Sequence, residues 1–198
     1  MEISRPKRIL IFASGSGSNA ENLIHFFRQA ENSMIADVVG IVCNNPQAGV
    51  IQRSERLNVP LYLISKEQWN DIGYMQELIQ YIFPDLIVLA GFLKRFHGDL
   101  IQLVQGNVIN LHPALLPKFG GKGMYGINVH TAVIEQGETV SGITIHWVNE
   151  QYDEGNIITQ FSCSVTAADS PEILAEKIHQ LEFDHFPETV KQVVLGLA

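Results

Sequence analysis

Residues 8–19 read RILIFASGSGSN, an apolar run that turns at once into alternating serine and glycine. The first half, residues 8–13, is rich in isoleucine and leucine, which is typical of a strand covered on both faces. The second half leads into residues 19–30, where apolar residues recur at helical spacing. A buried strand, a glycine turn and a helix in this order predict the start of a doubly wound α/β fold.

The alternation continues along the chain and extends the same fold. Short runs rich in Ile, Val and Leu predict further parallel strands, and the segments between them predict helices joined by right-handed crossovers. The expected strands are residues 35–43, 86–90 and 108–111, and the expected helices are residues 49–57, 66–82, 98–105 and 129–136.

The pattern changes after residue 138. Residues 139–149 and 156–165 read as two strands joined by a short loop, which predicts an antiparallel hairpin added to a mostly parallel sheet. A terminal helix is expected from about residue 170 to residue 193, because Ser170, Pro171 and Glu172 suit the cap, the first position and the first turn of a helix. No linker is visible, so residues 1–198 are expected to form a single domain.

Composition disfavours several classes of partner. The chain has 198 residues, of which 46% are hydrophobic, and no apolar run approaches the roughly 20 residues needed to span a bilayer. The net charge of −8 and the lack of a basic stretch disfavour nucleic acid and anionic membranes as partners. Cys43 and Cys163 lie in apolar runs far apart in the sequence, which is typical of buried free thiols. We therefore expect a cytoplasmic protein.

The glycine-rich segment after the first strand is a candidate phosphate site. Glycine lets backbone N–H groups approach an anion, and the N-terminus of the following helix adds partial positive charge. Residues 14–19 (SGSGSN) lack the third glycine of a dinucleotide fingerprint and the Lys-Ser/Thr of a P-loop. A tight turn rich in small residues, with no ligand, is the alternative interpretation.

A second candidate is the stretch NVINLHPALLP at residues 107–117. Residues two apart in a strand face the same side, so Asn110 and His112 project together. Pro113 removes a backbone donor and ends the strand, which fits a strand tip beside a cleft. Ligands of open α/β sheets bind beyond the carboxyl ends of the strands, so this pair is expected in a ligand site. A structural histidine with its own hydrogen-bond partners is the alternative.

Asp153 is the third candidate. It lies in QYDEG at residues 151–155, between the two late strands, where Asp and Gly are by default turn formers. The same loop can carry a carboxylate to an imidazole in the cleft. A metal site built from His112, His130, His146 and Asp153 is an alternative, but no HxH or HExxH spacing supports it, and we expect no metal.

Taken in order, these segments resemble the folate-dependent formyltransferases, most closely those that act on glycinamide ribonucleotide. The resemblance covers nearly the whole chain. It rests on SGSGSN at residues 14–19, AGFL at residues 90–93, NLHPALLP at residues 110–117, and the hairpin at residues 140–160 that contains Asp153. It implies a Rossmann-like formyltransferase fold that includes the antiparallel hairpin and the terminal helix.

The resemblance implies an enzyme of purine biosynthesis and one-carbon metabolism. A formyl group would pass from N10 of the co-substrate 10-formyltetrahydrofolate to the amine of 5-phosphoribosyl-glycinamide, by direct attack of the amine. Asn110, His112 and Asp153 match the family's catalytic trio. The Asn110 amide and a protonated His112 would stabilise the oxyanion of the tetrahedral intermediate. Asp153 would raise the pKa of His112 and hold its orientation.

Binding roles follow from the resemblance by position. Substrate binding is implied for the glycine segment and the terminal helix, and folate binding for the segment after the fourth strand and for the hairpin. The implied substrate residues are Gly17, Ser18, Asn19, His179 and Glu182, and the implied folate residues are Leu93, Lys94, Arg95, Phe96, Asn110, Asn149, Glu150, Gln151, Tyr152 and Asp153. Lys94 or Arg95 would meet the folate glutamyl carboxylate. An ordinary solvated helix face is the alternative for His179 and Glu182.

Relatives of this family supply the competing functions. Formyltetrahydrofolate hydrolase uses similar residues with water in place of the amine and is the main alternative, followed by another folate-dependent formyltransferase. Methionyl-tRNA formyltransferase carries an additional nucleic-acid-binding domain, which we do not expect in this acidic chain. A regulatory module that only retains the fold would not need the whole trio.

Two further expectations follow. The partners are small-molecule substrates, and the protein is a monomer or a homodimer. Residues 118–126 are rich in glycine and belong to a segment longer than in the commonest form of the family, which makes them a candidate lid over the site.

Overall fold

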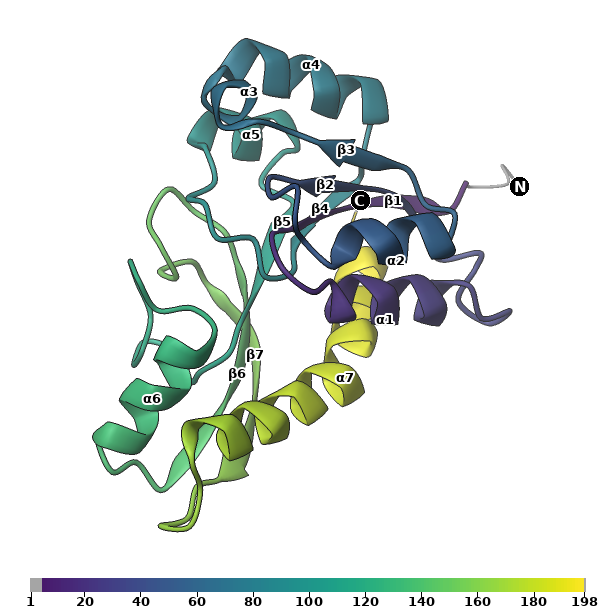
Figure 1. Ribbon diagram of the computed structural model, residues 1–198. Coiled ribbons are helices and arrows are strands. Elements are labelled where there is room, and N and C mark those ends of the chain that lie inside the picture. Colours follow the sequence, from purple (N-terminus) through teal and green to yellow (C-terminus); the bar gives the residue numbers. More distant parts are fainter. Residues whose placement is uncertain (1–4, 198) are drawn as a thin grey trace.

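The alternating segments build one seven-stranded sheet in a computed structural model that describes residues 5–197 (Figure 1). The strand order is β3-β2-β1-β4-β5-β6-β7; the first five strands pair in parallel, and β6 and β7 join antiparallel. The strands are β1 Lys7–Ala13, β2 Ala36–Cys43, β3 Leu61–Leu63, β4 Leu86–Leu89, β5 Val108–His112, β6 Val140–Trp147 and β7 Ile157–Ser164. The expected doubly wound sheet with an antiparallel hairpin is confirmed.

Helices cover both faces of the sheet, and buried side chains form one core on each face (Figure 1). Helices α1, α2 and α7 lie on one face and α3, α4 and α5 on the other, while α6 packs beside α7. The helices are α1 Ser18–Phe27, α2 Val50–Arg56, α3 Lys66–Asn70, α4 Ile72–Ile82, α5 Gly98–Leu103, α6 Ile127–Glu135 and α7 Pro171–Leu195. The expected terminal helix, α7, is confirmed.

Strand β1 illustrates how the sequence produces two cores. Its side chains alternate between the faces, and from Ile9 onward all of them are buried. Ile9 and Ile11 pack into the core that includes α1 and α7. Leu10 and Phe12 pack into the opposite core, where the Phe12 ring meets Phe92 edge to face at 5.2 Å between centroids. Truncating one such buried side chain lowers the free energy of unfolding by about 2–5 kcal/mol. This burial on both faces fixes β1 in the middle of the sheet.

Two local features differ from the expectation. The helix expected over residues 66–82 is divided at Asp71, whose backbone is extended and whose carboxylate accepts a hydrogen bond from the Tyr74 N–H at 3.1 Å. Asp71 thus caps α4 instead of continuing α3. Helix α3 itself begins after Ser65, as expected, in a capping box with Gln68. The unexpected edge strand β3 has only three residues, and they are incompletely buried, so they carry no two-sided apolar run.

The two cysteines differ in burial. Both are free thiols, but Cys43 is buried and Cys163 is half-buried. The expectation of buried thiols is therefore confirmed for Cys43 and wrong for Cys163, which lies on the edge strand β7, where exposure alternates along the strand. Burial raises the pKa of both thiols.

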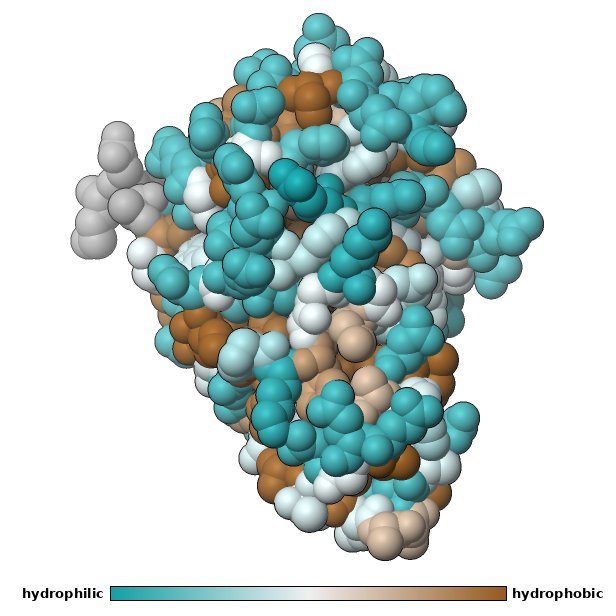
Figure 2. Space-filling model, turned by 90° about the vertical axis from the view of Figure 1, so that its left-hand side faces the viewer, coloured by the Kyte–Doolittle hydropathy of each residue, from teal (hydrophilic) through white to brown (hydrophobic). Residues whose placement is uncertain are grey.

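The surface is mixed in character. On the face shown in Figure 2, hydrophilic residues predominate and hydrophobic residues form separate patches. The 25-residue helix α7 carries acidic and basic residues along its length, such as Glu176 and Lys191. Within residues 5–197, no helix combines the length and the apolar character that crossing a membrane requires.

The strand order reverses between β1 and β4, which creates a crevice at their carboxyl ends. From β1 the chain builds outward to β2 and β3, and it then returns to the other side of β1 to form β4 and β5. Ligands of open α/β sheets bind at such a switch point. The Ser14 N–H donates to Gly91 O at 3.0 Å, which ties the loop after β1 to the loop after β4. The fold therefore brings the glycine segment and the tip of β5 to one edge of the sheet.

Candidate active site

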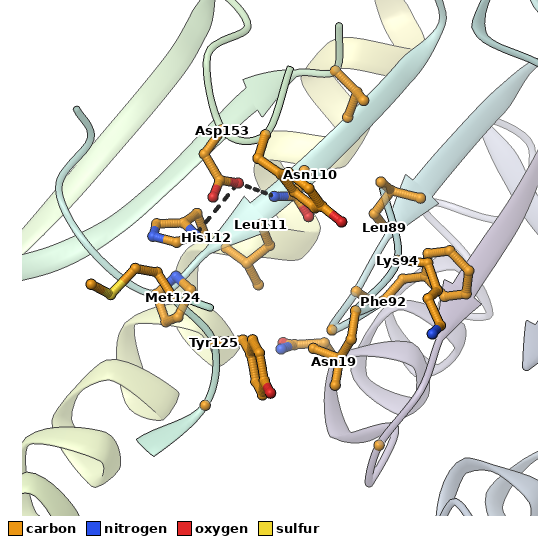
Figure 3. A pocket seen from close by; sticks show the side chains of 18 of the residues that line it. Asn19, Leu89, Phe92, Lys94, Asn110, Leu111, His112, Met124, Tyr125 and Asp153 are labelled. Atoms are coloured by element: carbon orange, nitrogen blue, oxygen red, sulfur yellow. Dashed lines mark hydrogen bonds and ion pairs between the residues drawn. The ribbon is translucent and has the colours of Figure 1, made fainter. Parts of the chain in front are cut away.

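A cavity of about 660 Å³ opens at this switch point. Its walls are the loops that follow β1, β4 and β5, the loop between β6 and β7, and parts of α6 and α7. This volume suits a small-molecule ligand. Asn110 and His112 line the cavity from β5, and Asp153 enters from the loop between β6 and β7 (Figure 3).

The three candidate catalytic residues meet at one carboxylate oxygen. Asp153 Oδ1 lies 3.4 Å from Asn110 Nδ2 and 3.6 Å from His112 Nδ1 (Figure 3). Asp153 has φ 57, a left-handed conformation that aspartate adopts more readily than most residues. The hairpin turn thus brings a carboxylate to the amide and the imidazole at the tip of β5.

The loop between β5 and α6 contacts both members of the Asp–His pair. His112 Nε2 donates to Phe119 O at 2.8 Å, and the Gly121 N–H donates to Asp153 Oδ2 at 2.8 Å. A carbonyl oxygen only accepts, so Nε2 carries the proton of the neutral ring, and Nδ1, which faces Asp153, is the basic atom. Gly120 packs against the Asp153 side chain, because a Cβ there would lie 3.2 Å from Asp153 Cβ. The backbone of the predicted lid therefore determines which nitrogen of His112 can take up a proton.

Burial governs the protonation of His112. It lowers the pKa of His112 below the ordinary value for histidine, and the Asp153 carboxylate and the Phe119 carbonyl reverse this only in part. The His112 ring is therefore neutral in this structure, and its protonated form in the tetrahedral intermediate stays a prediction. Burial also disfavours the Asp153 anion, yet the neighbouring His146 and His112 rings and the Gly121 N–H hold the pKa of Asp153 below its ordinary value. The pair consists of a carboxylate and a neutral imidazole that is ready to accept a proton.

The glycine segment forms another wall of the cavity. Gly17 has φ 78, and a Cβ there would lie 2.5 Å from Val50 Cγ2, so the turn requires glycine. Helix α1 begins at Ser18, which places the positive end of its dipole at the cavity wall. Asn19 Nδ2 donates to Glu182 Oε2 on α7 at 2.9 Å, and burial raises the pKa of Glu182. This wall suits a phosphorylated ligand that also carries hydroxyl groups.

Known proteins match nearly the whole length of the chain. The family described as "Formyl transferase" matches residues 7–190. The chain belongs to the formyl transferase family. Its relatives include the chloroplastic phosphoribosylglycinamide formyltransferase of Arabidopsis thaliana, 38% identical over 191 residues, which covers 94% of this chain and 65% of the relative. The phosphoribosylglycinamide formyltransferase of Bacillus subtilis (strain 168) is 35% identical over 195 residues, which covers 96% of each.

The fold of this formyl transferase family member matches solved structures of the same kind. The crystal structure of phosphoribosylglycinamide formyltransferase from Bacillus halodurans superposes with a TM-score of 0.84 at 30% identity and covers 97% of each chain. In sequence length, the chain spans less than two thirds of the Arabidopsis relative and nearly all of the Bacillus subtilis one.

The cavity gathers nearly all of the residues that the resemblance implies. They come from the tip of β5, the glycine segment, α7, the segment after β4 and the hairpin. Those lining the cavity are Asn110, His112, Asp153, Gly17, Ser18, Asn19, His179, Glu182, Leu93, Lys94, Arg95, Phe96, Asn149, Gln151 and Tyr152. Glu150 is the exception: it does not line the cavity, and its carboxylate lies against Gly98 at the start of α5. The individual binding roles stay predictions.

The resemblance implies no catalytic or binding role for several further side chains that line the cavity. Among them are Met124 and Tyr125 on the loop after β5, His130 on α6 and His146 on β6. Figure 3 draws Met124 and Tyr125 among the side chains that line the cavity together with His112 and Asn19. For His146, the signal in the sequence is strand periodicity, which places every second residue of β6 on the face that carries the site. Its pairing with β5 is visible only in the folded sheet.

Two of the three histidines proposed as alternative metal ligands, His112 and His146, are engaged with protein groups. His112 Nε2 pairs with Phe119 O, and the two nitrogens of His146 lie 2.9 Å from Trp147 O and 3.1 Å from Asn110 Nδ2. Among residues 5–197, no three His, Cys, Asp or Glu side chains are grouped so that they could hold a metal ion.

Proposed function

We propose that the chain transfers the formyl group of 10-formyltetrahydrofolate to the amine of glycinamide ribonucleotide, a reaction of purine biosynthesis. The observation that carries the proposal is the meeting of Asn110, His112 and Asp153 in a cavity that also contains the glycine turn. Relatives named as phosphoribosylglycinamide formyltransferases support it. The proposal treats the chain as one formyltransferase domain.

The two substrates would occupy different walls of the cavity. The backbone at Gly17 and the N-terminus of α1 suit the phosphate of the ribonucleotide, and Asn19 with Glu182 suits its ribose hydroxyls. On the other wall, Phe92 and neighbouring apolar groups suit the folate ring, and the exposed Lys94 suits a carboxylate of the folate tail. The formyl carbon and the amine would then meet beside the tip of β5.

The trio would act on one proton and one developing charge. The amine nitrogen forms a bond to the formyl carbon, and the bond from that carbon to N10 of the folate breaks with its electron pair. The Asn110 amide donates a hydrogen bond to the oxygen that becomes negative. His112 Nδ1 accepts the proton that the amine loses and returns it to N10, and Asp153 stabilises the imidazolium in between. No bond to the protein forms.

Product analysis tests the proposal and separates it from the hydrolase alternative. The purified chain is incubated with 10-formyltetrahydrofolate, with and without glycinamide ribonucleotide, and tetrahydrofolate, formate and formylated ribonucleotide are quantified by mass spectrometry. We expect tetrahydrofolate and formylated ribonucleotide in equal amounts, and only when both substrates are present. Formate released without the ribonucleotide would instead indicate formyltetrahydrofolate hydrolase.

Two variants on the hairpin loop provide controls for the assay. Asp153→Asn removes the charge at the centre of the site, and we expect it to abolish most of the product. Glu154→Gln removes the charge of the adjacent, solvent-exposed residue and should react like the wild type. A wild-type chain that forms neither product would contradict the proposed function.

A further inference from the structure

His146 on β6 is a buried histidine to which the proposed reaction assigns no role. It is 2% exposed and lies directly opposite Asn110 in the antiparallel β5–β6 ladder, so the two side chains are neighbours on one face of the sheet. The β6–β7 register shifts between Ile145 and His146, and such bulges re-aim side chains next to active sites. The position of His146 therefore calls for an explanation in terms of its cross-strand partner.

Hydrogen bonding fixes the tautomer of the His146 ring. Nδ1 lies 2.9 Å from Trp147 O, and because a carbonyl oxygen can only accept, Nδ1 carries the proton. In a neutral ring Nε2 then carries a lone pair. It lies 3.1 Å from Asn110 Nδ2 and 3.7 Å from Asp153 Oδ1, so the Asn110 amide, and not the carboxylate, is within hydrogen-bond distance. Trp147 is itself held in place, because its N–H donates to Asn156 O at 2.9 Å and a Cβ on Gly155 would collide with its carbonyl oxygen. His146 is thus built to accept a hydrogen bond from Asn110.

This contact determines which end of the Asn110 amide faces each neighbour. Nδ2 is directed at His146 Nε2 and, more weakly at 3.4 Å, at Asp153 Oδ1. Turning the amide by 180° would place its carbonyl oxygen against a ring lone pair and a carboxylate, all of them acceptors. The partner groups therefore allow one orientation. In it, one N–H is anchored on His146, and the other can move from the long contact with Asp153 to an oxyanion in the cavity.

We propose that His146 is a positioning residue that locks the Asn110 amide with an N–H, and not its carbonyl, available to the oxyanion of the reaction. The inference rests on the proposed function for the meaning of that oxyanion, but the contact itself does not depend on it. Oxyanion donors stabilise the transition state only if they are held in the correct direction beforehand. His146 would supply that constraint from the strand that pairs with β5.

Kinetics of three variants on β6 test the role. His146→Leu fills the site with an apolar side chain and removes the acceptor, and His146→Gln restores an acceptor. Ser141→Ala removes a buried hydroxyl elsewhere on β6 that makes no hydrogen bond. We expect kcat of His146→Leu to fall on the order of 10–10²-fold, somewhat less than the loss of a whole oxyanion donor. KM of both substrates should stay within about threefold, because substrate binding does not use the contact. His146→Gln should recover part of the loss, and Ser141→Ala should match the wild type.

Coupling between the two residues separates positioning from general destabilisation. If His146 acts through Asn110, then His146→Leu should cost almost nothing in a chain that already carries Asn110→Ala. A fall of the same size in both backgrounds would overturn the proposal, and so would a His146→Leu chain with wild-type kcat. A rise in KM alone, with kcat unchanged, would also count against it.

Nuclear magnetic resonance tests the contact without any turnover. The Asn110 side-chain amide signal, identified by its loss in Asn110→Ala, should shift in His146→Leu and stay in place in Ser141→Ala. In the wild-type chain, the nitrogen chemical shifts of the His146 ring should show the proton on Nδ1. A proton on Nε2 would overturn the proposal. Because this measurement uses the wild-type chain, it does not depend on whether a variant folds. A chain with these signals but no formyl transfer would contradict the proposed function and leave the His146–Asn110 contact intact.

Discussion

Asp153 Oδ1 lies 3.6 Å from His112 Nδ1, and the other oxygen of the same carboxylate accepts the Gly121 N–H at 2.8 Å. One side chain therefore contacts both the basic nitrogen of the site and the loop between β5 and α6. Because burial lowers the pKa of His112 while Asp153 raises it, protonation of His112 during the reaction depends on this carboxylate. The charge of Asp153 and the seating of the loop can be tested separately.

Asp153→Asn keeps the shape of the side chain and removes its charge. We expect the pKa of His112 to fall further, because the group that raises it is lost, and kcat to fall on the order of 10²–10⁴-fold. KM should change much less, since the charge matters mainly when a proton reaches His112. The measurements are steady-state kinetics and a titration of the His112 ring by nuclear magnetic resonance.

A structural role for Asp153 makes the opposite prediction. Asparagine forms turns as well as aspartate does, so a residue that only shaped the hairpin would tolerate the change with near-normal turnover and an unmoved pKa of His112. The charge-based role also predicts non-additivity: after His112→Ala, replacing Asp153 should cost little more.

Gly120→Ala should displace the loop from the trio. The added Cβ would lie 2.6 Å from Leu116 Cδ2 and 3.2 Å from Asp153 Cβ, so either the Leu116 side chain or the loop backbone has to shift, and we expect the loop backbone to move. Moving it would weaken the Gly121–Asp153 and Phe119–His112 hydrogen bonds together, and we expect kcat to fall on the order of tenfold with little change in melting temperature. Lys118→Ala, which alters an exposed side chain of the same loop, is the control. Equal kcat in the two variants would show that the loop does not orient the pair.

Much of the fold was predictable because the sheet is covered on both faces. The strands β1, β2, β4 and β5 are rich in Ile, Val and Leu, and such segments are visible in a sequence without any knowledge of partners. Strand β3 was not predictable, because Leu61–Leu63 is a short edge strand whose formation depends on pairing with β2. The break at Asp71 depends on a cap hydrogen bond, which competes locally with a continuous helical pattern.

Only the part of the site that consists of reactive side chains was predictable from the sequence. Asn110 and His112 are two apart in one strand, and Asp153 follows in a hairpin, so periodicity and resemblance suffice to find them. The contribution of Phe119 is a backbone carbonyl, which leaves no mark in a sequence. The lowered pKa of His112 results from burial by segments distant in the chain, and a neighbouring carboxylate alone suggested the opposite direction. His146 became interpretable only through its partner on β5.

The glycine segment and α7 should serve the ribonucleotide and not the folate. Asn19 and Glu182 are joined by a 2.9 Å hydrogen bond on the wall of the cavity where α1 begins. Asn19→Ala or Glu182→Ala should therefore raise KM for glycinamide ribonucleotide by at least about tenfold, as expected for the loss of a hydrogen bond to a ligand. KM for 10-formyltetrahydrofolate should change less than about twofold. Equal effects on both substrates would refute the division of the cavity.

Chelation should leave formyl transfer unchanged. Direct attack of an amine on the formyl carbon, with proton transfer through His112, uses no metal ion in any step proposed above. The test is activity after exhaustive treatment with a chelator followed by its removal, compared with a mock-treated sample. Activity that is lost and then restored specifically by Zn²⁺ or Fe²⁺ would contradict this mechanism.

His130 should make folding stability depend on pH. Burial, together with His179 and His112, lowers the pKa of His130 to about 4, and its Nδ1 has no hydrogen-bond partner. Between pH 6.5 and pH 4 the unfolded chain binds a proton at this ring that the folded chain does not. The contribution of His130 to the free energy of unfolding is therefore fully present above pH 6.5. It is lost as the pH is lowered, and this one group lowers the free energy of unfolding by at most about 1.4 kcal/mol per pH unit. The raised pKa of Glu182 acts in the opposite sense, so a comparison of variants is needed to isolate His130.

His130→Leu removes the titrating ring and provides that comparison. Urea unfolding of the wild type and the variant at pH 7 and pH 5 should show a smaller loss of unfolding free energy in the variant, by roughly 1–2 kcal/mol over the two units. At pH 7 the variant should be at least as stable as the wild type, because a buried nitrogen without a partner is replaced by an apolar group of similar size. Ser141→Ala, which removes a buried hydroxyl without a hydrogen-bond partner and no titratable group, is the control and should leave the pH dependence unchanged. If His130→Leu loses as much free energy between pH 7 and pH 5 as the wild type does, His130 is not held neutral by burial.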